Sequence, residues 1–153
     1  MKDLPSLIEY VNNIKPTQTK LVYHSTWAYQ QDSEHKGFAN YNNNQLEMYQ
    51  QIIDVSRKMS KNKTFKFVTP VGTAIQNART SSISDHFTRD GYHLELHYGR
   101  FTAACTWFEK LYGIDVRKNS FKPKTITEIQ AKIAKEAAHQ AVSKPYKIST
   151  IKY

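Results

Sequence analysis

Two short strand patterns, separated by a helix pattern, limit the folds open to this chain more than any other feature of its sequence. Residues 20–25 (KLVYHS) and 64–70 (TFKFVTP) both fit strands, and Pro70 ends the second. Strands that alternate with helices predict an α/β fold with a parallel sheet. Parallel sheets are normally wider than two strands, so we expect the chain to hold only part of such a fold.

Apolar residues at helical spacing predict helices at residues 4–14, 44–59, 71–79, 97–112 and 125–142. The strongest pattern is at 97–112, with an apolar stripe of Phe101, Ala104, Cys105, Phe108, Leu111 and Tyr112. Gly113 follows it as a C-terminal cap. Thr125 and Glu128 fit a capping box that would open the last helix. The polar stretch 30–43 is expected to be a loop.

Composition is typical of a globular protein. Of 153 residues, 39% are hydrophobic and 23% are charged, which suits a chain that buries a core. No apolar run approaches the ~20 residues of a membrane helix, and the first ten residues do not resemble a signal peptide. A single cysteine excludes an internal disulfide. We therefore expect no membrane partner, and the sequence assigns no compartment.

Basic residues are concentrated near the C-terminus. Residues 110–153 hold ten Lys and Arg against three Asp and Glu. In the expected last helix, however, Lys132 and Lys135 are interleaved with Glu128 and Glu136, as on the solvated side of an amphipathic helix. Aromatic residues are sparse there, so we expect no nucleic-acid partner.

The candidate catalytic residues lie just before the expected helix at 97–112. They belong to the segment Arg89-Asp90-Gly91-Tyr92-His93-Leu94. An Asp three residues before a His can hold the imidazole by its Nδ1–H. Nε2 is then left to take a proton from a hydroxyl group. Asp90 and His93 would form the orienting and basic parts of a nucleophile–base–orienter arrangement.

The surrounding sequence resembles the C-terminal part of SGNH (GDSL-like) serine hydrolases, and more narrowly an uncharacterised bacterial SGNH-like domain family. The phrases that carry this resemblance, in family order, are HSTWAY (24–29), TPVGTAIQNAR (69–79), TRDGYHL (88–94) and GRFTAACTWFEKLYG (99–113). The resemblance implies a three-layer flavodoxin-like fold with a parallel sheet. It also implies that His93 is the catalytic base and Asp90 its orienting partner.

The chain departs from the family pattern at the nucleophile. None of its five glycines begins the Gly-Asp-Ser or Gly-Asn-Ser block, and the Gly-x-Asn-Asp block of the oxyanion hole is also missing. Ser25 follows a strand but lacks the glycine of a nucleophile elbow. We therefore expect residues 1–115 to be the C-terminal portion of the hydrolase domain. Residues 116–153 are expected to form a basic amphipathic helix and tail, packed on that domain or trailing it.

The resemblance implies that the parent protein is an esterase or deacetylase, acting on small-molecule or carbohydrate-linked esters. The competing hypothesis is a truncated or partner-dependent fragment with no activity of its own. With the preceding strands missing, the edge of the strand at 20–25 would be open. We then expect the chain to form a homo-oligomer or to need its N-terminal half.

Three further residues are candidates for substrate binding. Trp27 and Tyr92 could line a substrate cleft or only pack, and Arg89 could bind substrate or pair with a carboxylate. His93 and His97 have a spacing that can bind metal, but no third ligand accompanies them. We expect no metal and no cofactor, and we expect Cys105 to be a buried small hydrophobe.

Overall fold

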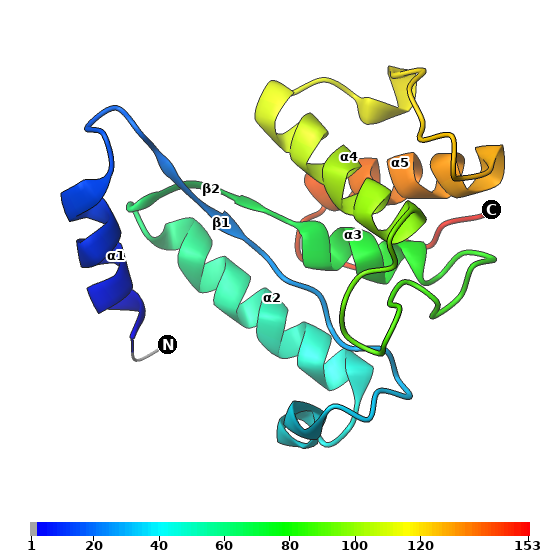
Figure 1. Ribbon diagram of the computed structural model, residues 1–153, viewed down its shortest axis with the longest axis horizontal. Coiled ribbons are helices and arrows are strands. Elements are labelled where there is room, and N and C mark those ends of the chain that lie inside the picture. The colour runs from blue at the N-terminus through cyan, green and yellow to red at the C-terminus, as the bar shows by residue number, and fades with distance from the viewer. Residues whose placement is uncertain (1–2) are drawn as a thin grey trace.

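The computed structural model describes residues 3–153 (Figure 1). These residues form five α-helices, two strands and two 3-10 helices. In chain order they are α1 (Leu4–Ile14), β1 (Leu21–His24), η1 (Lys36–Tyr41), α2 (Gln45–Lys61), β2 (Phe65–Thr69), α3 (Val71–Ala78), α4 (Tyr98–Tyr112), η2 (Val116–Lys118) and α5 (Glu128–Ser143). Every helix and strand expected from the sequence is present, and η1 lies within the expected loop 30–43.

The capping box of the last helix is misplaced in the sequence prediction. Thr127, not Thr125, is the N-cap of α5, and its hydroxyl accepts the N–H of Gln130 at 3.2 Å. The Gln130 side chain accepts the N–H of Thr127 at 2.9 Å. Ile126 is buried in the cluster that contains Val116, so the chain reaches it before the helix begins. At the end of α4, Gly113 adopts the left-handed conformation of the expected cap, with φ 67°.

The sheet consists of β1 and β2, which pair in parallel. Leu21 is opposite Phe65 and His24 is opposite Thr69, with one irregularity between Leu21 and Tyr23. No further strand joins this sheet within residues 3–153. The architecture is therefore mixed α/β with a small parallel sheet, and it lacks the wide sheet of a complete three-layer flavodoxin-like fold.

Helices pack on both faces of the two strands, with α2 on one side and α4 on the other (Figure 1). Successive residues of an extended chain point to opposite faces, and the end of β1 follows this rule. His24 stacks on Trp107 of α4 with ring centroids 5.8 Å apart. The next residue, Ser25, accepts a hydrogen bond at 2.9 Å from Ser56 of α2.

The largest buried cluster surrounds α3, whose eight residues are all buried. Ile75 of α3 packs in this cluster with Ile133 of α5 and with Ile151 of the C-terminal segment. That segment returns to α3 and its following turn, where Ser149 N–H donates to Asn77 at 2.7 Å and Ile151 N–H to Thr80 at 2.8 Å. Residues 116–153 are thus packed and hydrogen-bonded into the same core as the preceding helices.

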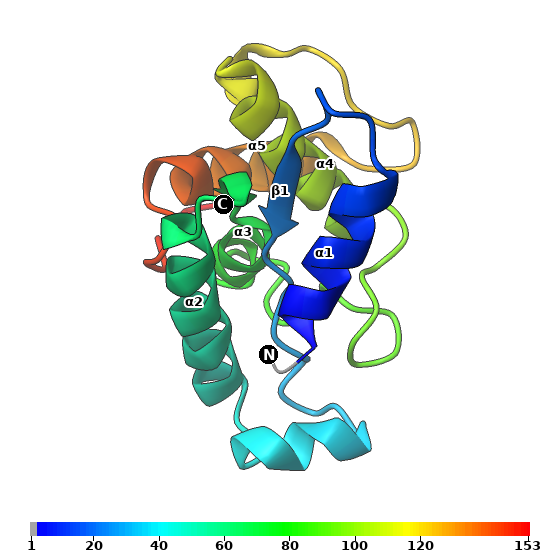
Figure 2. The same ribbon diagram turned by 90° about the vertical axis from the view of Figure 1, so that its left-hand side faces the viewer.

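The opposite end of the molecule is far less covered. Helix α1 stands apart from the other helices and has no buried residue (Figures 1 and 2). Its Leu7, Tyr10 and Ile14 side chains are 58%, 63% and 65% exposed. One edge of β1 is paired with β2, and no strand of residues 3–153 pairs with its other edge. No helix in the described part of the chain is long and apolar enough to span a membrane.

The crossing of residue 26 over the start of α3 gives the first prediction. A Cβ on Gly72 would lie 1.9 Å from the carbonyl oxygen of Thr26, which is backbone and cannot rotate away. We expect Gly72→Ala to lower the free energy of unfolding by about 2 kcal/mol. This loss exceeds the gain of about 1 kcal/mol from the better helix propensity of alanine.

Urea denaturation followed by circular dichroism measures the change, with Gly113→Asn as the control. Gly113 also has a positive φ, but nothing lies within 4 Å of its Cβ position, and asparagine tolerates this backbone conformation. The free energy of unfolding lost in Gly113→Asn should stay below about 1 kcal/mol. Equal losses in the two variants would contradict a special role for the Gly72 crossing.

Candidate active site

Asp90 and His93 form a hydrogen-bonded pair in the loop that precedes α4. Nδ1 of His93 lies 2.7 Å from Oδ2 of Asp90, so the contact expected from the sequence is present. The other carboxylate oxygen accepts the backbone N–H groups of His93 at 2.8 Å and Tyr92 at 3.3 Å. The His93 side chain is 52% exposed. Its Nε2 has no hydrogen-bond partner within residues 3–153.

The segment that follows β1 holds this loop in place. The Trp27 indole N–H donates to the carbonyl of Tyr92 at 2.8 Å, and the Gln30 N–H donates to the carbonyl of Gly91 at 2.8 Å. Gly91 has φ 85°, and a Cβ there would lie 2.8 Å from Oγ of Ser33. Only glycine satisfies both the backbone conformation and the close approach.

An ion pair between the buried Arg79 and the half-buried Asp85 fixes that supporting segment in turn. Nε of Arg79 lies 2.7 Å from Oδ1 of Asp85, and the Arg79 guanidinium also donates to the carbonyl of Ala28 at 3.0 Å. Oδ2 of Asp85 accepts the N–H of Gln31 and the amide of Gln45, both at 2.8 Å. Burial lowers the pKa of Arg79 to about 10, so the guanidinium stays charged at neutral pH.

The three candidate substrate residues take different places around His93. The Tyr92 ring packs against the imidazole with centroids 4.1 Å apart. Arg89 is exposed, with Nε 3.8 Å from the Asp90 carboxylate. Trp27 uses its N–H on the loop backbone, so this group is not available to a ligand. Tyr92 is therefore beside the imidazole and Arg89 beside the Asp90 carboxylate, whereas Trp27 supports the loop.

Ser25 and Cys105 cannot act as nucleophiles in this arrangement. Ser25 is fully buried, and its hydroxyl accepts the hydrogen bond from Ser56. Burial raises the pKa of the Cys105 thiol to about 12, so it stays protonated and inert. The missing elbow glycine already argued against Ser25 as a substitute nucleophile, and its burial is a second argument against it.

One group of side chains has the composition of a metal site. Ligand atoms of Glu109, Asp115 and His139 lie within 4.8 Å of one another. Protein donors already occupy the carboxylates: His139 Nδ1 is 2.8 Å from Glu109, the Val116 N–H donates to Glu109 at 2.9 Å, and Arg117 pairs with Asp115 at 2.8 Å. The group connects α4, η2 and α5 as an ion-pair and hydrogen-bond cluster. No local sequence pattern indicates this cluster, because its members are far apart in the chain.

The Asp90–His93 pair predicts the tautomer of the imidazole. The hydrogen bond from His93, assisted by backbone N–H groups, lowers the pKa of Asp90 to about 2. The carboxylate is ionised at neutral pH and can only accept, so a neutral His93 must carry its proton on Nδ1. The stabilisation from this contact is complete above the unfolded pKa of about 4 and is lost as pH falls through about 2.

Nitrogen-15 NMR of the imidazole side chains checks this tautomer. We expect wild-type His93 at neutral pH to show a protonated Nδ1 and an unprotonated Nε2. Asp90→Asn, whose amide can donate to Nδ1, should shift the proton to Nε2. The exposed His97, four residues away, is the internal control and should not change. Identical His93 signals in both proteins would show that Asp90 does not orient the ring.

Comparison with known proteins shows which family this chain belongs to. Residues 1–141 match the family described as "Domain of unknown function (DUF4886)". A crystal structure of a DUF4886 family protein from Bacteroides uniformis ATCC 8492 is 47% identical in sequence and superposes with a TM-score of 0.91. The match covers 97% of this chain but only 57% of that chain. No curated protein matches significantly. The chain belongs to the DUF4886 family.

Proposed function

We propose that the chain supplies the catalytic base of an SGNH-type serine ester hydrolase. The observation that carries this proposal is the 2.7 Å contact between Asp90 and Nδ1 of His93, with Nε2 of His93 left without a partner in the described residues. It is supported by the order of the four phrases that resemble SGNH hydrolases, and by helices on both faces of a parallel strand pair.

In the proposed mechanism a serine outside this chain attacks the acyl carbon of the ester. His93 accepts the serine proton on Nε2 and then gives it to the leaving alcohol, while the Asp90 carboxylate stabilises the imidazolium. Water then attacks the acyl-serine ester. His93 accepts the proton of this water on Nε2 and gives it to the serine oxygen as the acid is released. Tyr92 and Arg89 would contact the substrate, for which we propose a carbohydrate-linked ester, because a ring and a guanidinium can pack on and hydrogen-bond to a sugar.

The remainder of the three-layer flavodoxin-like fold belongs to the same proposal. A further parallel strand would pair with the free edge of β1, and the elements attached to it would cover Leu7, Tyr10 and Ile14 of α1. The matched solved structure has the extra length needed, since 57% of its chain corresponds to this one. The nucleophile and the oxyanion-hole donors would then come from that additional part.

A non-catalytic, partner-dependent fragment is the second candidate. The burial of Ser25 and the absence of a Gly-Asp-Ser or Gly-Asn-Ser block favour it, because a base without a nucleophile has little to activate. The two candidates differ in whether supplying the additional part restores hydrolysis.

The activity prediction has two steps. The isolated chain should hydrolyse p-nitrophenyl acetate no faster than its His93→Ala variant. Co-expression with the part of the Bacteroides uniformis protein that lies outside the match should then give turnover. In that complex, His93→Ala should reduce kcat by about a thousandfold, whereas His97→Ala, an exposed neighbour, should leave it unchanged.

Two outcomes would contradict the proposal. Turnover in the complex that survives His93→Ala would exclude His93 as the base. A stable complex without any turnover would favour the non-catalytic candidate. Asp90→Asn should also lose activity in an active complex, with less effect on KM than on kcat, because it acts on the ring and not on the substrate.

The open edge of β1 and the exposed face of α1 predict the assembly of the isolated chain. Unpaired strand edges and apolar patches favour association with another chain. Sedimentation velocity over a concentration series should show self-association. Adding the complementary part should replace it with a one-to-one complex.

Leu7→Lys with Ile14→Lys on the α1 face should weaken association, whereas Glu9→Lys on the same helix serves as the charge-matched control. A compact monomer at all concentrations would contradict this prediction.

A further inference from the structure

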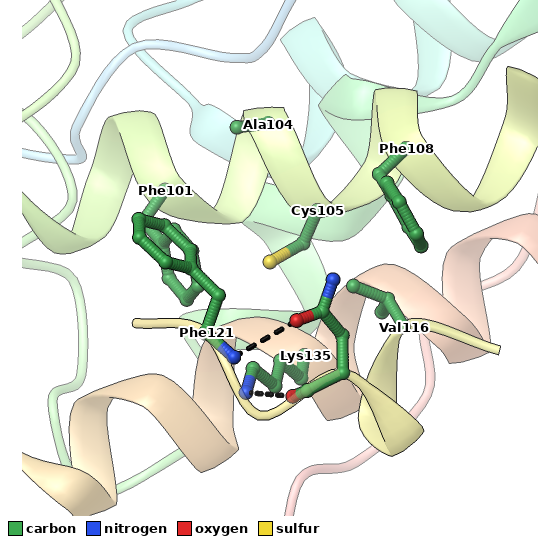
Figure 3. A pocket seen from close by; sticks show the side chains of 8 residues that line it. Phe101, Ala104, Cys105, Phe108, Val116, Phe121 and Lys135 are labelled. Carbon is green, nitrogen blue, oxygen red and sulfur yellow. Dashed lines mark hydrogen bonds between the residues drawn. The ribbon is translucent and has the colours of Figure 1, made fainter. Parts of the chain in front are cut away.

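A hollow lies between α4, α5 and the connection that joins them (Figure 3), and neither Asp90 nor His93 lines it. Its volume is about 280 Å³, just below the range typical of small-molecule sites. The walls are formed by Phe101, Ala104, Cys105, Phe108, Val116, Asn119, Phe121 and Lys135.

The sequence pattern of α4 explains why this hollow is apolar. Positions 101, 104, 105 and 108 share one helix face, and all four line the hollow. Val116, Asn119 and Phe121 of the connection line it as well. Phe121 of this connection is 65% exposed although its ring lies 6.3 Å from that of Phe101. It forms an outer wall that a ligand could bury further.

The polar groups at the hollow that keep unused hydrogen-bonding capacity are donors. The Lys135 ammonium donates to the carbonyl of Asn119 at 2.5 Å, which leaves two of its three N–H groups. The Asn119 side-chain oxygen accepts the N–H of Phe121 at 2.8 Å. Within residues 3–153, the Asn119 amide nitrogen has no hydrogen-bond partner and Lys135 has no carboxylate in ion-pair range.

The charges near these donors leave room for an anion. The neighbouring Glu136 carboxylate is paired with Arg117 at 3.2 Å. Burial raises the pKa of the Cys105 thiol to about 12, so this residue of the wall is uncharged at neutral pH. The nearby Glu109 carboxylate is held by His139 and by the Val116 N–H. An apolar wall with a half-buried ammonium at its rim complements a molecule that has an apolar chain and one anionic end.

We propose that this hollow binds a small amphiphilic monocarboxylate. Its carboxylate would accept hydrogen bonds from the Lys135 ammonium and the Asn119 amide, and its chain would lie among Phe101, Phe108 and Phe121. This site is separate from the proposed active site and does not depend on the presence of a nucleophile. A fully polar ligand would leave the aromatic walls unused, and a neutral one would leave the Lys135 charge without compensation.

The test uses octanoate as the probe and 1-octanol as the uncharged control of equal chain length. Titrations followed by ¹H–¹⁵N correlation spectra of the full 153-residue chain give both the affinity and the location. We expect saturable octanoate binding, with the largest shifts at the backbone amides of residues 101–108 and 116–121. Lys135→Gln should weaken octanoate about tenfold and leave octanol binding unchanged. Lys132→Gln, an exposed lysine of α5 that does not line the hollow, is the matched control.

A second pair of variants addresses the walls. Ala104 is exposed, so Ala104→Trp can close the hollow from outside with little effect on folding, and it should abolish binding of both probes. Phe121→Ala removes the outer wall and should weaken both equally. The proposal is overturned if octanoate does not saturate, if its shifts lie elsewhere, or if Ala104→Trp leaves binding intact. It is also overturned if octanol binds as tightly as octanoate and Lys135→Gln has no effect.

Discussion

The close crossing of Thr26 over Gly72 is the contact on which the candidate site depends. Beside it, the Ser25 N–H donates to Thr69 at 3.0 Å and the Gly72 N–H donates to Ser25 at 3.1 Å, so the chain after β1 is attached to the end of β2 and the start of α3. From this point residues 27–31 reach the loop that carries Asp90 and His93. A change at the crossing would therefore move the imidazole without contacting it.

Backbone contacts, and not burial, give the Asp90–His93 pair its geometry. Both side chains are substantially exposed, so their electrostatic attraction alone contributes little in water. The loop is instead fixed by Trp27, Gln30 and the left-handed Gly91, and its carboxylate also caps two backbone N–H groups. An exposed base on a well-supported loop is ready to receive a partner surface, which fits the proposal that the nucleophile lies on another part of the complete fold.

The sequence predicted the elements with short-range signals and missed what depends on distant residues. Periodicity placed both strands and all five α-helices, and the three-residue spacing of Asp90 and His93 indicated their contact. The capping box was misplaced because the burial of Ile126 against Val116 is decided by tertiary packing. Leu111 and Tyr112 fit the apolar stripe of α4 but are exposed, since helical spacing does not tell where covering elements end. The support of Asp85 by Gln45 joins residues 40 positions apart, which no local pattern reveals.

Burial is distributed unequally between the two ends of the molecule. This inequality is the physical basis of the proposal that an additional part of the fold pairs with β1 and covers α1. The C-terminal segment after α5 is hydrogen-bonded to Asn77 and Thr80, and it places Ile151 in the main core. Helix α1 buries none of its residues, and its Leu7, Tyr10 and Ile14 side chains are exposed. An amphipathic helix gains most of its stability from packing such a face, so an isolated α1 is marginal. The free edge of β1 lies at this same poorly covered end (Figure 2). A strand-bearing partner would stabilise both features at once, whereas separate partners for each would require two unrelated interfaces.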